Sequence, residues 1–125
     1  MKTITSQELM LQAWWDEALI YSDHFFDTTA TLSDTEGDDM VSLFDELQMI
    51  RRSFEGAEYP VFVSTARQYL LNSMAEVTLS FRAFFAGDAG AARVYMHTAQ
   101  EELRNLQDEV DRLGLNYMNP DPYLH

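Results

Sequence analysis

The sequence contains no cysteine, and only three prolines and five glycines, among its 125 residues. Without cysteine there are no disulfide bonds and no thiolate-bound metals, which fits a reducing compartment. No apolar run approaches the roughly 18 residues of a membrane-spanning helix, and the first ten residues lack the apolar core of a secretion signal. We therefore expect a cytoplasmic protein that contacts no membrane.

Basic residues are also scarce, since eight Lys and Arg face 21 Asp and Glu, giving a net charge of −13. Between Lys2 and Arg51 there is no Lys or Arg at all. A surface of one sign repels nucleic-acid phosphates and attracts basic partners. The charge therefore predicts no direct binding of nucleic acid and a protein partner with a basic surface. The residues predicted to meet this partner are Trp15 and ten acids: Asp16, Glu17, Asp23, Asp27, Asp34, Glu36, Asp38, Asp39, Asp45 and Glu46.

Apolar residues are abundant, at 46% of the chain, and they recur with helical spacing. The longest pattern lies between Pro60 and Gly87, where an apolar residue appears every three or four positions. It predicts a helix over about 60–86, with Pro60 in its first turn and Gly87 at its end. The members of this stripe are Val63, Ala66, Leu70, Met74, Val77, Phe81 and Phe84.

Similar patterns predict three more helices, over about 6–26, 38–54 and 89–113. The sequences from Thr5 to Glu8 and from Ser33 to Glu36 resemble capping boxes, while the β-branched, Gly-containing segment 27–39 is typical of a loop. Short connections between four amphipathic helices favour an all-α, antiparallel four-helix bundle. We expect a single domain over 1–125, with a Pro-containing tail at 114–125.

Two adjacent tryptophans, Trp14 and Trp15, lie on the first predicted helix. Neighbouring helical positions point about 100° apart, so both indoles are buried only where the helix is covered on two sides. A second apolar row, formed by Trp15, Leu19 and Phe26, indicates the same breadth of coverage. Two interpretations remain: core packing, or an aromatic anchor at an interface with a partner or a second copy.

The sequence contains no strong catalytic or metal-binding motif. The Glu-x-x-His motif of carboxylate-bridged metal centres is absent, as are glycine-rich phosphate loops and serine nucleophile motifs. Asp23, His24 and Asp27 are of ligand type, but we interpret them as a solvated helix end. His97 and Glu101 are four residues apart and predict an exposed ion pair. The sequence thus predicts no catalytic residue, no metal site and no cofactor.

The favoured function is a non-catalytic, acidic protein-binding module, such as an inhibitor, an immunity-type protein, an adaptor or a small chaperone. Homodimerisation through the first or last helix is a natural extension. The first alternative is a DNA or RNA mimic, of the kind that phages encode, which inhibits a nucleic-acid-handling enzyme. The second is a metal-dependent helical hydrolase, for which Asp108 and Asp111 have the required spacing. The acidity is also compatible with adaptation of the source to salt.

Overall fold

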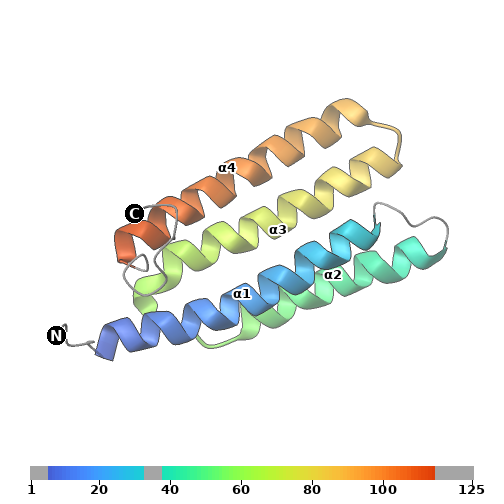
Figure 1. Ribbon diagram of the computed structural model, residues 1–125. Coiled ribbons are helices and arrows are strands. Elements are labelled where there is room, and N and C mark those ends of the chain that lie inside the picture. Colours follow the sequence, from blue (N-terminus) through green and yellow to red (C-terminus); the bar gives the residue numbers. More distant parts are fainter. Residues whose placement is uncertain (1–5, 33–37, 115–125) are drawn as a thin grey trace.

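The computed structural model describes residues 6–32 and 38–114, and every regular element in these two ranges is helical. The chain forms α1 (Ser6–Leu32), α2 (Asp38–Gly56), the short 3₁₀ helix η1 (Val61–Val63), α3 (Ser64–Phe85) and α4 (Ala89–Leu113). Consecutive helices run in opposite directions (Figure 1). The predicted all-α four-helix bundle is therefore confirmed. Thr5, the segment from Ser33 to Glu36, and the tail beyond Gly114 lie outside the described residues.

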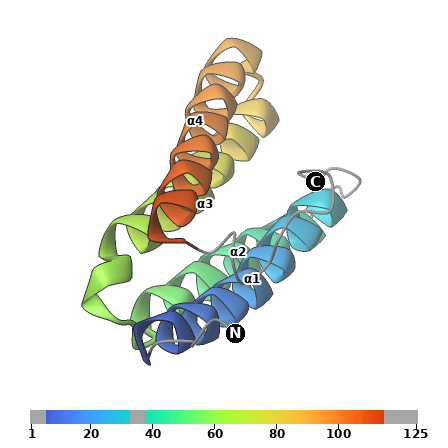
Figure 2. The ribbon, with the colours of Figure 1, turned by 60° about the vertical axis from the view of Figure 1, so that its left-hand side comes forward.

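The helices form two hairpins, α1 with α2 and α3 with α4, which are joined mainly through contacts between α2 and α3. The hairpins lie side by side where α3 begins, and their axes separate toward the turn between α3 and α4 (Figure 2). None of the described helices is long and apolar enough to cross a membrane.

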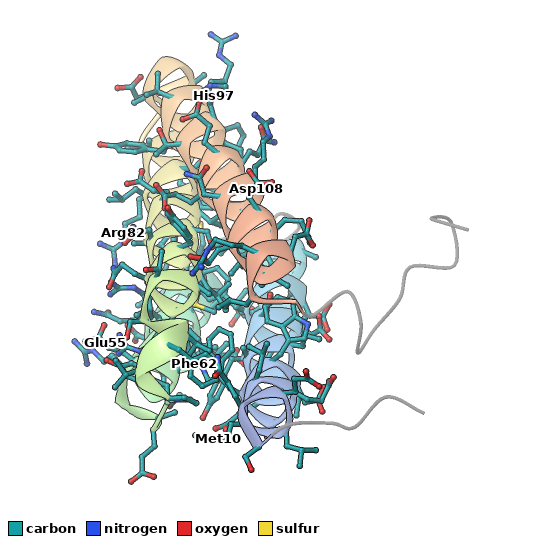
Figure 3. The ribbon with its side chains drawn as sticks, turned by 90° about the vertical axis from the view of Figure 1, so that its left-hand side faces the viewer. Met10, Glu55, Phe62, Arg82, His97 and Asp108 are labelled. Carbon is teal, nitrogen blue, oxygen red and sulfur yellow. The ribbon has the colours of Figure 1, made fainter. Side chains whose placement is uncertain are left out.

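The core lies between the hairpins and is centred on α3. Val63, Ala66, Leu70, Met74 and Val77 of the predicted stripe are buried against Phe25 and Leu32 of α1 and Leu47, Ile50 and Phe54 of α2. Charged side chains project around the outside of the helices, and Phe62 lies at the end where α3 begins (Figure 3). The stripe loses its cover where the hairpins separate, because Phe81 is half-buried and Phe84 is 61% exposed.

Helix α1 continues to Leu32, so the prediction of an end near residue 26 and a loop from 27 was wrong. Thr28 and Thr29 bond back within the helix, since their hydroxyls donate to the carbonyls of His24 (2.8 Å) and Phe26 (2.7 Å). Both threonines are buried on the same face as Phe25 and Leu32. Tertiary burial of this face outweighs the low helix propensity of β-branched residues.

The start of the third helix also differs from the prediction. Pro60 has an extended ψ of 143° and precedes η1, so the α-helix begins at Ser64 rather than at the proline. The Ser64 hydroxyl donates to the carbonyl of Val61 at 2.6 Å and thereby stabilises this tight first turn.

The third helix ends at the glycine that the sequence predicts. Gly87 adopts a left-handed φ of 86°, and the amides of Gly87 and Asp88 donate to the carbonyls of Phe84 and Ala83, which is a Schellman cap. The Asp88 carboxylate then accepts from the amide of Ala91 at 3.0 Å and caps α4.

Small residues let α3 and α4 approach closely. Ala92 and Ala99 of α4 are buried. The buried Ser80 hydroxyl of α3 donates to the carbonyl of Ala92 at 2.7 Å and so links the two helices directly.

Replacing Gly87 by Ala is expected to lower the free energy of unfolding by about 1 kcal/mol, because an L-residue is strained at a left-handed φ. An added Cβ would meet nothing within 4 Å, so the cost is confined to the backbone. Gly56→Ala is the matched control, since its Cβ also meets nothing within 4 Å and its φ is not positive. Chemical denaturation should show a stability that is unchanged or raised for Gly56→Ala. Equal losses in the two variants would contradict this account.

Candidate partner-binding surface

The outward side of α1 carries acidic and apolar residues together. Leu9, Asp16, Ile20, Asp23 and Asp27 are all exposed and follow one another at spacings of seven, four, three and four residues. Such spacing places them along one side of a helix, opposite the buried row. We call these five residues the outer α1 face. Ile20 is 70% exposed and Leu9 59%, so apolar area is interspersed with the carboxylates.

Helix α2 extends this surface. Asp45 is exposed and Met49 is 62% exposed, and both line an open groove of about 490 Å³ between the two helices. The groove is also lined by Tyr21 and His24 from α1, and by Ser42, Glu46, Ile50 and Ser53 from α2. We call it the α1–α2 groove.

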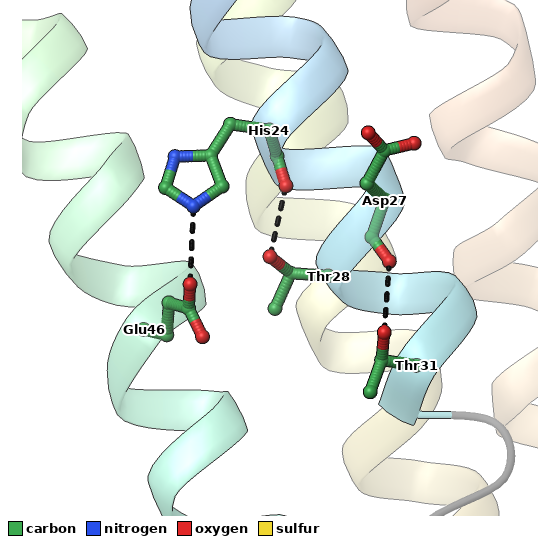
Figure 4. A network of polar contacts seen from close by, with 5 residues as sticks. All are labelled: His24, Asp27, Thr28, Thr31 and Glu46. Atoms are coloured by element: carbon green, nitrogen blue, oxygen red, sulfur yellow. Dashed lines mark hydrogen bonds and ion pairs between the residues drawn. The ribbon is translucent and has the colours of Figure 1, made fainter.

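One polar contact joins the two helices across this groove. His24 Nε2 lies 3.0 Å from Glu46 Oε1, and both side chains are partly exposed (Figure 4). Figure 4 shows the Asp27 carboxylate directed away from this pair. His24 therefore does not converge with Asp27.

No group of three or more His, Asp or Glu side chains in the described ranges is arranged to hold a metal ion. On α4, the exposed Asp108 lies outside any such cluster, while Asp111 accepts a hydrogen bond from Gln107 at 2.9 Å.

The tryptophan pair divides between core and surface. Trp14 is buried, while Trp15 is half-buried and packs against the core cluster, with 6.0 Å between the two ring centroids. Core packing accounts for Trp14. For Trp15, the role of an interface anchor stays a prediction.

The remaining predicted residues lie on several sides of the molecule. Glu17 is exposed and borders a small cavity that Trp14, Tyr59 and Arg67 also line, away from the outer α1 face. Asp39 is exposed at the start of α2. Asp34 and Glu36 lie outside the described residues, as does the side chain of Asp38. The structure therefore brings Asp16, Asp23 and Asp27 onto one face, with Asp45 and Glu46 on the adjacent helix.

Several of the described basic side chains pair with carboxylates away from the outer α1 face. Arg51 pairs with Glu55 at 4.0 Å, and the predicted pair of His97 with Glu101 is present at 3.0 Å. A hydrogen bond and the charge of Glu109 raise the pKa of Arg112 above its usual value. Because the described part of α1 and the first three turns of α2 contain no Lys or Arg, the outer α1 face has no basic neighbour on its own helix.

The apolar part of this surface was not predicted from the sequence. The acids were assigned to the partner, but Leu9, Ile20 and Met49 were not. The signal was present, because Ile20 lies four residues after Asp16 and three before Asp23, and thus on their side of the helix.

Replacing Asp16, Asp23 and Asp27 together by Asn is expected to raise the thermal midpoint by a few degrees at low salt. The reason is that these exposed carboxylates repel one another and the other acids of the chain. When NaCl is raised from about 10 to about 200 mM, the thermal midpoint of the triple variant should also rise less than that of the parent chain, because there is less repulsion to screen. Melting curves followed by circular dichroism measure both effects.

The control for this experiment is the α4 variant Glu101→Gln with Asp108→Asn and Asp111→Asn. It removes three charges from a helix that also carries Arg93, Arg104 and Arg112, so its thermal midpoint should rise less than that of the α1 variant. An equal gain in the two variants would mean that the arrangement on α1 has no special effect.

Comparisons with protein-family models, with curated proteins and with solved structures find no match to this chain. The function is therefore inferred from the side chains that the structure places together.

Proposed function

We propose that this chain is a non-catalytic protein-binding module that uses the outer α1 face and the α1–α2 groove to bind a protein with a basic surface. The observation that carries the proposal is the mixture on the outer α1 face: three exposed carboxylates on a helix whose described residues include no Lys or Arg, interspersed with two exposed large apolar side chains. A cytoplasmic location and an inhibitor, immunity, adaptor or chaperone role remain part of the proposal.

The two kinds of side chain have different roles in binding. Long-range attraction by the carboxylates raises the association rate of a basic partner. Burial of Ile20, Leu9 and Met49 then slows dissociation, because removing apolar area from water stabilises the complex. Both kinds lie on helices, where the backbone is already ordered, which limits the entropy lost on binding.

The apolar residues also favour a protein partner of the ordinary kind over mimicry of nucleic acid. Asp16, Asp23 and Asp27 are separated along the helix by about 10 and 6 Å, which resembles the spacing of phosphates only in part. A phosphate backbone has no counterpart to the exposed Ile20 that lies between Asp16 and Asp23. Mimicry remains the alternative, and competition between an oligonucleotide and this chain for the partner would distinguish it.

The proposal is tested by capturing partners from the source organism and measuring binding of the identified protein to three variants. For Asp16→Asn with Asp23→Asn and Asp27→Asn, we expect an association rate about tenfold lower at low salt and a weaker dependence on salt. For Ile20→Ser, we expect an unchanged association rate and a dissociation rate about tenfold higher. Stopped-flow or surface-plasmon kinetics would measure both rates.

The α4 variant defined above serves again as the control, because it removes the same charge from another surface. It should leave the dissociation rate unchanged and lower the association rate much less. An association rate that is independent of ionic strength in the parent chain would exclude electrostatic steering. Size-exclusion chromatography at several concentrations would test homodimerisation separately.

A further inference from the structure

A second groove lies at the other hairpin, beside the turn between α3 and α4. It has a volume of about 500 Å³, which is within the range of small-molecule sites. Its lining is largely apolar and consists of three phenylalanines, two alanines and a methionine, with one serine and one arginine as its polar members. We call it the α3–α4 groove.

Phenylalanine rings form one wall of this groove and are held in place by the core. Phe85 meets Phe84 edge to face with ring centroids 5.5 Å apart, and Phe81 stacks on Phe85 at 6.3 Å. Phe85 also contacts Phe44 of α2 at 6.1 Å. Phe84 is nevertheless 61% exposed, because the two hairpins separate toward this turn (Figure 2). The folded chain therefore presents a preformed aromatic wall that an apolar ligand would shield from water.

The charge in the groove is positive. Arg93 is the one charged residue among the described residues that line it, and its side chain is exposed. No carboxylate of the described ranges pairs with Arg93. Asp88 is the only acid between Glu76 and Glu101, and its carboxylate is bound to a backbone amide as the cap of α4. The groove thus combines apolar walls with a guanidinium whose N–H donors are free.

We propose that the α3–α4 groove binds a small amphipathic carboxylate, of the kind represented by a medium-chain fatty acid. The apolar part of the ligand lies against Phe84 and Met96, where burial of each methylene contributes up to about 0.8 kcal/mol. The carboxylate binds Arg93, because a guanidinium offers two parallel N–H donors that match the two oxygens. This site is separate from the outer α1 face and goes beyond the partner-binding function.

The size of the groove favours a small ligand over a protein. A stable protein interface covers about 800 Å² and roughly 20–30 residues on each partner, and far fewer residues line this groove. The other exposed large apolar residues of α3 and α4 are Leu79 and Val94, and neither lines the groove. A second copy would also bring another net charge of −13 close to the first.

The charge part of the proposal is tested with decanoate and with 1-decanol, a neutral probe of the same chain length. Isothermal titration calorimetry of the full chain at neutral pH measures both affinities. Arg93→Gln should weaken decanoate binding about fivefold and leave decanol binding unchanged. Arg104→Gln is the matched control, because it removes the same charge from an exposed position of α4 outside the groove. Equal weakening in the two variants would overturn the proposal.

The apolar part is tested with Phe84→Ser, which should weaken the binding of both probes about tenfold. Val94→Ser is the control, since Val94 is 64% exposed on the same hairpin and does not line the groove. Unchanged decanoate binding in Phe84→Ser would refute the proposal, as would the lack of saturable binding to the parent chain below about 1 mM.

Size-exclusion chromatography of the same variants identifies a competing occupant. The parent chain and Phe84→Ser should elute at the same position at every protein concentration. A dimer of the parent chain that Phe84→Ser dissociates would mean that a second copy fills the groove, and would overturn the proposal. None of these substitutions changes the outer α1 face, so the results are independent of the partner-binding function.

Discussion

The structure depends on burial of one apolar stripe along α3. The residues from Val63 to Val77 lie between the two hairpins, and they are what α1 and α2 pack against. Burying a side chain of this size contributes about 1.5 to 3 kcal/mol. Surface ion pairs contribute less than about 1 kcal/mol each. The core is therefore the main force that holds together a chain whose net charge of −13 would otherwise drive it apart.

A polar cluster fixes the end at which the hairpins meet. The Arg67 guanidinium lies 4.2 Å from the ring centroid of Tyr59, and its Nη2 donates to the carbonyl of Glu55 at 2.7 Å. Arg51 reaches across from α2 and donates to the carbonyl of Leu71 at 3.4 Å. These contacts tie the end of α2 to α3 near η1. At the opposite end, Phe44 and Phe85 still meet edge to face, with ring centroids 6.1 Å apart, but α1 and α4 do not close over Phe84.

Helical periodicity was sufficient to predict the fold class and most of the helices, because each helix buries a single stripe. The bounds of α4 agreed with the predicted range of 89–113, because a capping Asp88 and a left-handed Gly114 fix the two ends locally. The predicted end of α1 was wrong, because Thr28 and Thr29 become helical through burial against other elements, which local helix propensity does not reveal.

The separation of the hairpins was likewise not predictable. It depends on how far α1 and α4 lie from each other, and a stripe reveals only that a residue prefers burial, not whether a neighbour is there. The acids of the candidate site were found from composition alone, whereas the exposed Ile20 and Met49 required knowledge of which side of each helix faces water.

The two exposed apolar surfaces therefore differ in origin. Ile20 and Leu9 lie opposite the core, where folding does not need them, and Ile20 lies between Asp16 and Asp23. Phe84 lies on the core side and is exposed only because the bundle is open there, beside Arg93. The first surface lies on a helix whose described part has no Lys or Arg, whereas the second has Arg93 at its rim, so the two apolar surfaces differ in the charge around them as well as in origin.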